Sequence, residues 1–223
     1  MLLNLLLFLL FIYFIFFNYN SYIFGLLLRL YGFKINKKNI KNLPSKLILI
    51  SSHTSIYDFF ICLALNYSIF HKKFNYYILM KKIFSDLCSP FLPFIDNKFK
   101  LIEVFKNNKG ITQQLIDSLK DKDNYILYLA PEGTRKLNKD LRKGYWVLSN
   151  ELDVKVMYIG VDFVKKYIFF EKPRYVELEW ENEKIQFINS CKKYIPLYPE
   201  RCYWTKDFYE TQNSSESDSL SDK

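Results

Sequence analysis

From residue 47 onward, short apolar runs with the composition of β-strands alternate with stretches that have the periodicity of helices. This alternation predicts an α/β domain, with a mixed or largely parallel sheet flanked by helices. The chain has 223 residues, 50% of them hydrophobic, which suits one such domain with a short segment at each end. The expected strands are residues 47–50, 76–80, 101–104, 125–129, 154–163, 167–170 and 175–180, and the expected helices are residues 55–66, 82–87, 111–120, 144–152 and 183–194.

The first 33 residues differ from this domain because they are almost uniformly apolar. Residues 1–17 contain Asn4 as their only strongly polar side chain, and a second apolar run covers residues 23–28. As a helix, the first run spans roughly 26 Å, slightly less than the roughly 30 Å hydrocarbon core of a bilayer. We therefore expect an N-terminal membrane-anchoring helix, or a short helical hairpin broken at residues 18–20. A signal peptide fits poorly, because the basic residues and cleavage site are absent.

A basic segment, residues 34–46, follows with five lysines and no acidic side chain. Lysines beside an apolar anchor favour the cytosolic side and anionic headgroups. The net charge of the chain is +9, and without residues 210–223 the remaining 31 basic and 19 acidic side chains give +12. We expect the anionic partner to be the membrane surface and not nucleic acid, because the anchor brings the membrane closest. Residues 210–223 are acidic and rich in serine, and they are expected to be disordered.

The cysteines and histidines do not suggest a metal site. The four cysteines, Cys62, Cys88, Cys191 and Cys202, show no CxxC spacing, and the chain has two histidines, so the ligands of a zinc site are lacking. Unpaired thiols suit a reducing compartment, although four cysteines also allow two bridges. We expect no metal ion.

The first candidate site combines His53 and Asp58. Residues five apart cannot share a helix face, and on a strand they point to opposite sides. The two side chains can meet only if a strand ends near His53 and a helix starts before Asp58, and the order of residues predicts this turn. A structural alternative is that Ser55 and Asp58 form a capping box, with His53 in a loop without a catalytic role.

A second loop, residues 130–136, also follows an expected strand. Pro131 ends that strand, and Gly133 lets the backbone come close to a ligand. Arg135 presents a planar fork of donors that matches a phosphate group. Taken alone, the loop is equally consistent with a turn that carries a surface arginine.

Taken in order, the two loops resemble the glycerolipid acyltransferase superfamily, which includes glycerol-3-phosphate and lysophosphatidate acyltransferases. The resemblance covers roughly residues 47–163 and rests on His53-x4-Asp58 followed by Pro131-Glu132-Gly133-Thr134-Arg135. Between these blocks, Lys81 stands at the family's basic position and Lys106 at the position of a family arginine. The chain departs from the family pattern at Lys106, at Ala130 in place of phenylalanine, and at Tyr158 in place of a proline.

The resemblance implies a membrane-bound O-acyltransferase that moves a fatty acyl group from acyl-CoA or acyl-carrier protein to a hydroxyl of a lysophosphatidate-type glycerophospholipid. His53 would be the general base, oriented by Asp58. No cofactor is expected besides the acyl-CoA co-substrate. The acyltransferase domain would cover residues 47–209 and face the cytosol. The expected substrate-binding residues are Glu132, Gly133, Thr134, Arg135, Lys106 and Lys81.

Other functions remain open on the sequence alone. The acceptor or donor can differ, as in acylation of glycerol-3-phosphate or phospholipid transacylation. A non-catalytic lipid-binding protein would need neither His53 nor Asp58. A nucleic-acid-binding protein would rest on the basic charge alone, and its binding would depend steeply on salt.

Overall fold

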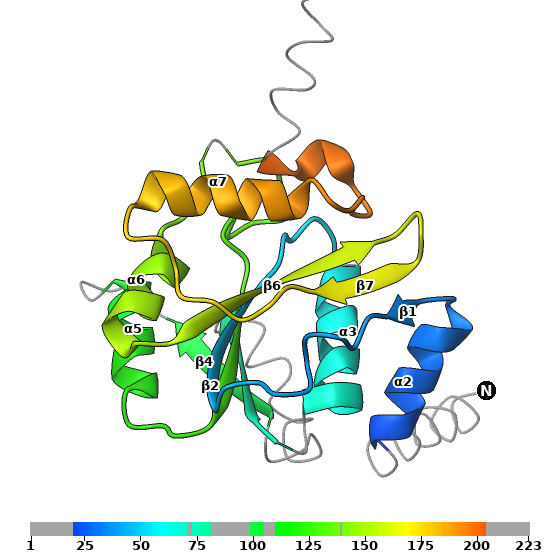
Figure 1. The fold of residues 1–223 in the computed structure, drawn as a ribbon, viewed down its shortest axis with the longest axis horizontal. Helices are drawn as coiled ribbons and strands as arrows, with labels where there is room; N and C mark the ends of the chain where they lie inside the picture. Colours follow the sequence, from blue (N-terminus) through cyan, green and yellow to red (C-terminus); the bar gives the residue numbers. More distant parts are fainter. Residues whose placement is uncertain (1–19, 71–72, 82–98, 105–109, 139, 204–223) are drawn as a thin grey trace, which may run out of the picture.

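The computed structural model describes residues 20–70, 73–81, 99–104, 110–138 and 140–203 (Figure 1). The apolar run at residues 1–17, the expected helix at residues 82–87 and the tail at residues 210–223 lie outside these ranges. Among the described residues, no helix combines the length and the apolar character needed to cross a bilayer.

Within the described residues, seven strands form one mixed sheet in the order β1-β7-β6-β2-β5-β3-β4. The strand β2 pairs in parallel with both β5 and β6, whereas β6 and β7 are antiparallel. This mixed sheet confirms the α/β fold class. The strands are β1 (Lys34–Ile35), β2 (Lys46–Ile50), β3 (Asn75–Lys81), β4 (Phe99–Val104), β5 (Tyr125–Leu129), β6 (Lys155–Asp162) and β7 (Tyr167–Phe170).

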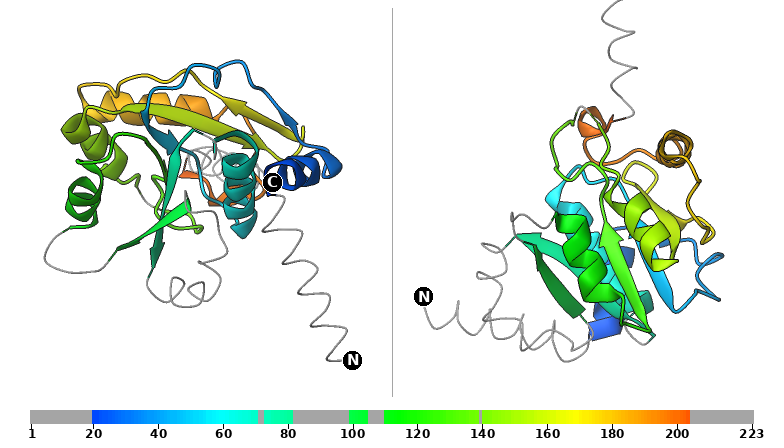
Figure 2. Two further views of the ribbon diagram at one scale, coloured as in Figure 1. Left: turned by 90° about the horizontal axis from the view of Figure 1, so that it is seen from below. Right: turned by 90° about the vertical axis from the view of Figure 1, so that its left-hand side faces the viewer.

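Helices cover both faces of the sheet (Figures 1 and 2). On one face, α2 (Asn20–Leu30) and α3 (Ile56–Leu65) pack with Leu47 and Leu49 of β2. On the other face, Ile48 and Ile50 pack with α5 (Ile111–Leu119), α6 (Gly144–Leu152) and α7 (Trp180–Cys191). Successive side chains of a strand point to opposite faces, so a strand buried on both faces is a continuous apolar run.

Residues 175–180 do not form the expected strand. Only Arg174 makes an isolated antiparallel bridge, with Val156, and Trp180 already begins α7. The backbone of Glu177 is occupied by side chains instead: its N–H donates to Oε2 of Glu183 and its carbonyl accepts from Nε1 of Trp146. These bonds hold the segment as a loop, although its alternating apolar pattern predicted a strand.

The segment at residues 34–46 contributes to the sheet at its start. Lys34 and Ile35 form β1, which pairs in parallel with Tyr167 and Ile168 of β7. The preceding helix α2 also joins the core, because Leu28 is buried in the cluster shared with α3.

Two short helices complete the described chain. The π-helix η1 (Asn66–Phe70) continues α3, and the 3-10 helix η3 (Pro199–Arg201) follows α7. In Figure 1, η3 (orange, after α7) lies near the loop that connects β2 to α3. The C-terminal part of the described chain therefore lies at the carboxyl ends of the central strands.

Candidate active site

The two motif loops leave neighbouring parallel strands at the same level. Ile50 of β2 is in register with Leu129 of β5, and His53 and Glu132 each follow three residues later. Parallel strands place their carboxyl ends at one edge of a sheet, where ligands bind in open α/β folds. The N–H of His53 donates to Oε2 of Glu132 at 3.1 Å, which joins the two loops directly.

His53 and Asp58 lie together, as the turn between β2 and α3 predicts. Nδ1 of His53 is 3.4 Å from Oδ2 of Asp58. Nδ1 is buried and makes no hydrogen bond with the described residues, so this approach is a charge contact, and the imidazole side chain as a whole is 27% exposed. Because Nδ1 faces the carboxylate, Nε2 is the ring nitrogen available to a substrate.

The capping box is also present. The side chain of Ser55 accepts from the N–H of Tyr57 at 3.1 Å, and Oδ2 of Asp58 accepts from the N–H groups of Thr54 at 2.8 Å and Ser55 at 2.7 Å. The capping box of Ser55 and Asp58 and the contact between His53 and Asp58 are therefore both present. The same oxygen of Asp58 starts α3 and faces the imidazole, so helix capping fixes the carboxylate that orients His53.

Glu132 is a buried carboxyl group, with 1% of its surface exposed. Burial disfavours its charged form and raises its pKa from 4.5 to about 8, although the bond from the N–H of His53 acts in the opposite direction. At neutral pH the group is then largely protonated and is a poor proton acceptor. Oε1 has no hydrogen-bond partner among the described residues. Because Oε1 is buried as well, Glu132 is suited to holding the loop.

Gly133 adopts a left-handed conformation with φ of 63°. A Cβ at this position would lie 2.6 Å from Nε of Arg142, so the space of the missing side chain is occupied by that arginine. Arg142 was not predicted as a site residue, because nothing in the motif shows that a residue so far along the chain folds back over Gly133. The N–H of Gly133 donates to the carbonyl of Ala130 at 3.0 Å, so this amide is not free for a substrate.

Of the other expected substrate-binding residues, some lie on the second motif loop and some lie outside the described part of the chain. Thr134 is half-buried, and its hydroxyl oxygen accepts from the N–H of Lys136 at 3.3 Å. Arg135 is exposed on the same loop and forms no ion pair with the described side chains. Lys106 and the side chain of Lys81 lie outside the described part of the chain. The structure thus brings His53, Asp58 and Glu132 together, with Gly133, Thr134 and Arg135 on the adjoining loop.

Two residues from the C-terminal part of the described chain, Tyr194 and Arg201, also contact the His53 loop. The hydroxyl of Tyr194 donates to Oγ of Ser52 at 2.9 Å. Nη1 of Arg201 donates to the carbonyl of Thr54 at 3.2 Å. Neither residue belongs to a sequence motif, and only the path of the chain after α7 brings them here.

A hollow of about 640 Å³ lies elsewhere, at the edge formed by β1 and β7. Asn36, Lys165 and Lys193 are among its lining residues, and no residue of the two motif loops lines it. Its carboxylates are already paired: Glu171 binds Lys193, and Asp162 accepts backbone N–H groups. We assign no chemistry to it.

Comparison with known proteins agrees with the fold. A family model described as "Acyltransferase" matches residues 34–157, a range that contains both motif loops. The crystal structure of the 1-acyl-sn-glycerophosphate (LPA) acyltransferase PlsC from Thermotoga maritima aligns with a TM-score of 0.52 and 11% sequence identity, over 78% of this chain and 75% of that chain. At this identity the likeness concerns the fold alone. No curated protein matches the chain in sequence.

Proposed function

Because the chain belongs to the acyltransferase family, it is an enzyme that transfers acyl groups, and we propose a specific reaction for it. The proposed donor is acyl-CoA or acyl-carrier protein, and the acceptor is a hydroxyl of a lysophosphatidate-type glycerophospholipid at a membrane. The observation that carries this proposal is the contact between Nδ1 of His53 and Oδ2 of Asp58 at the carboxyl edge of the sheet. The acceptor class is taken from the structural relative.

The proposed mechanism uses Nε2 of His53 as the general base. A lipid hydroxyl is a weak nucleophile at neutral pH, so Nε2 takes its proton while its oxygen attacks the thioester carbonyl carbon. The Asp58 carboxylate faces Nδ1 at 3.4 Å and stabilises the imidazolium that forms. The new C–O bond replaces the C–S bond, and the proton passes from the imidazolium to the leaving thiolate. The thioester is already activated, so no covalent acyl-enzyme is needed.

The acceptor phosphate is proposed to lie beside the second motif loop. Arg135 is exposed there, and Arg142 covers Gly133 with its guanidinium group. Neither arginine side chain has an ion-pair partner among the described residues, so both charges are available to an anion. Lys106 and Lys81 are proposed to add positive charge. Thr134 is proposed to contact the acceptor through its hydroxyl, and Glu132 is proposed to hold the loop in place for the acceptor through its bond to the N–H of His53.

The membrane is proposed as the source of the acceptor, with the catalytic domain facing the cytosol. Leu26 and Leu30 of α2 and Tyr31 just beyond its end are 53%, 73% and 74% exposed, so this helix presents apolar side chains at the surface. They follow the apolar run and precede the lysines of residues 34–46. An anionic bilayer matches both features.

The test is an assay of the purified full-length protein with acyl-CoA and separate acceptors. Three acceptors are tested separately: lysophosphatidate, glycerol-3-phosphate and a lysophospholipid without a terminal phosphate. Thiol release and product mass are both measured. We expect acylated product with lysophosphatidate, and no product with the His53→Ala variant. Product with glycerol-3-phosphate alone would reassign the acceptor. Wild-type transfer by His53→Ala would refute the mechanism.

A further inference from the structure

We propose that residues 191–202 position the catalytic histidine, with Tyr194 and Arg201 as positioning residues. This inference rests on the proposed role of His53 as the general base. It adds a second support to the one that Glu132 and Asp58 provide. The family match ends at residue 157, so this support comes from a part of the chain beyond the matched region.

The residues on either side of His53 are held in place by hydrogen bonds from other parts of the chain. Three consecutive residues, Ser52 to Thr54, are held by side chains from two segments, the second motif loop and residues 191–202. Ser52 accepts from the hydroxyl of Tyr194, the N–H of His53 donates to Glu132, and the carbonyl of Thr54 accepts from Arg201. The C-terminal segment therefore contacts both immediate neighbours of the histidine. A rotation of the His53 peptide would break at least one of these bonds.

The segment that makes these contacts is itself fixed to the domain. Cys191 and Cys202, at its two ends, are buried. The carbonyl of Ile195 accepts from the N–H of Phe163, just beyond β6, at 2.8 Å. The guanidinium carbon of Arg201 lies 4.0 Å from the centroid of the Tyr198 ring. A support of this kind can hold the loop, because its own position is set by the sheet and by α7.

The position of His53 matters because transfer requires Nε2, the acceptor hydroxyl and the thioester carbon to be aligned. A misplacement of about 1 Å in such an arrangement can cost about 10²-fold in rate. Substrate binding, by contrast, is proposed to depend on the second motif loop. Loss of the C-terminal contacts should therefore lower kcat and leave KM largely unchanged.

The experiment compares Tyr194→Phe, Arg201→Ala and Arg201→Lys with the wild-type full-length protein. Tyr194→Phe removes one hydroxyl from a buried site, and Arg201→Ala removes the donor to Thr54. We expect each to lower kcat by about 10- to 100-fold and to leave KM for both substrates unchanged. Arg201→Lys should recover part of the loss, because an ammonium group can still donate to a carbonyl.

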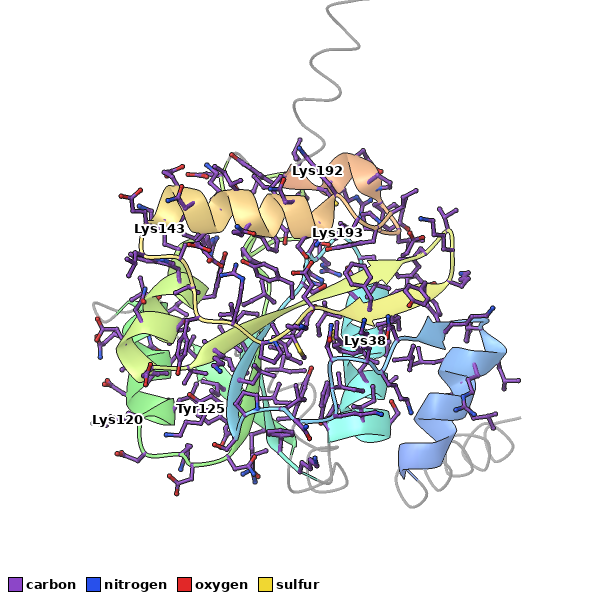
Figure 3. All side chains as sticks on the ribbon, in the orientation of Figure 1. Lys38, Lys120, Tyr125, Lys143, Lys192 and Lys193 are labelled. Atoms are coloured by element: carbon purple, nitrogen blue, oxygen red, sulfur yellow. The ribbon has the colours of Figure 1, made fainter. Side chains whose placement is uncertain are left out.

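Two control variants separate positioning from a general loss of stability. Tyr145→Phe also removes a buried tyrosine hydroxyl, one that donates to Glu183 at 3.2 Å, so it should lower the melting temperature without lowering kcat. Lys120→Ala removes an exposed cation just after α5 (labelled in Figure 3), and it should leave both quantities unchanged.

The outcomes distinguish this inference from the function on which it rests. If Tyr194→Phe and Arg201→Lys fold and keep the wild-type kcat while His53→Ala is inactive, the positioning role is wrong and the mechanism stands. If Tyr194→Phe lowers kcat only as much as Tyr145→Phe does, the effect is general destabilisation and the inference is again overturned. If His53→Ala keeps wild-type transfer, both proposals fail. Should Arg201→Ala not fold, Tyr194→Phe and Arg201→Lys decide the question.

Discussion

At the scale of single residues, the site depends on one oxygen of Asp58 that serves two groups. Oδ2 accepts the N–H groups of Thr54 and Ser55 and lies 3.4 Å from Nδ1 of His53. The first role needs an acceptor of any charge, because the N3 residue of a capping box can be an amide as well as a carboxylate. The second role needs the negative charge, because that charge stabilises the imidazolium. A substitution that keeps the acceptor and removes the charge separates the two roles.

Asp58→Asn is therefore expected to keep the melting temperature close to wild type and to lower kcat by about 10²–10⁴-fold. The control is Ser55→Ala, which removes the cap and should cost about 1 kcal/mol of stability while leaving kcat unchanged. Thermal unfolding and steady-state kinetics on the same preparations provide the measurement. A silent Asp58→Asn variant would mean that Asp58 only caps α3.

Glu132 predicts a dependence of stability on pH. Its folded pKa of about 8 lies above the ordinary value of 4.5, so between these values the folded protein holds a proton that the unfolded chain has released. The contribution of Glu132 to the free energy of unfolding therefore falls as pH rises from 4.5 towards 8, and it changes no further above 8. Glu132→Gln removes this titration and keeps an amide oxygen for the N–H of His53.

The measurement is the melting temperature of wild type and Glu132→Gln across that pH range. The melting temperature of the variant should rise relative to that of the wild type as pH rises, and this difference should level off above about pH 8. Two parallel profiles would show that the Glu132 carboxyl does not titrate abnormally. Glu132→Ala, which also loses the acceptor, should lower kcat more than Glu132→Gln does.

The sequence predicted the central residues of the site because they follow strand ends. His53 and Glu132 come directly after apolar runs that proved to be neighbouring parallel strands, so the loops had to meet at one edge. Tyr194, Arg201 and Arg142 were not predictable in this way. Their contacts depend on how the chain returns after α7 and after the second loop, and local patterns do not encode such long-range paths.

At the scale of secondary-structure elements, the buried central strands were predicted most accurately. The expected first and last residues of β5 and α6 are those observed. In each case turn-forming residues next to an apolar run mark where the element begins or ends. The error at residues 175–180 has a different origin. Its alternating pattern is that of a strand, yet Glu183 and Trp146 bind its backbone, so side-chain contacts replaced the pairing that the pattern predicted.

Glu183 also explains Tyr158, which stands where the family pattern has a proline. Glu183 is fully buried and accepts from the hydroxyls of Tyr145 and Tyr158, while the Arg174 guanidinium donates to both of its oxygens. These bonds connect α6, β6 and the loop before α7 to α7 itself. Tyr158 is thus part of a buried network in this protein, and it lies on a strand that needs no proline.

Glu183→Ala is expected to destabilise the protein by about 3–5 kcal/mol, because it removes the buried partner of Arg174 and leaves only the more distant Glu177, 4.0 Å away. Glu181→Ala is the matched control, since Glu181 is exposed on the same helix and forms no hydrogen bond or ion pair with the described side chains; it should change stability by less than about 0.5 kcal/mol. Denaturant unfolding measures both. A Glu183→Ala variant of near wild-type stability would show that the network is not needed to hold α7.

At the scale of the whole molecule, the sequence predicted the family and the mixed sheet, and the family match and the structure confirm both. It did not predict that residues 34–35 would join the sheet beside β7, because two residues are too few to carry a strand pattern. The acceptor is also not fixed by the fold. The groups proposed to select it, Arg135 and Arg142, lie on an exposed loop whose charge fits any phosphate-bearing lipid.

The last prediction concerns attachment to the membrane, which follows from the composition of residues 1–17. Full-length protein is expected to stay in the membrane fraction after washing with alkaline carbonate, because an apolar run of this length inserts favourably into hydrocarbon. Leu9→Arg and Leu10→Arg place two charges near its middle, at a cost of roughly 2.5–3.5 kcal/mol each, and should move the protein to the soluble fraction. Leu220→Arg, in the acidic tail, is the control and should not change the distribution. Wild-type protein released by carbonate would contradict an integral anchor and would favour attachment through the lysines of residues 34–46, which high salt should then reverse.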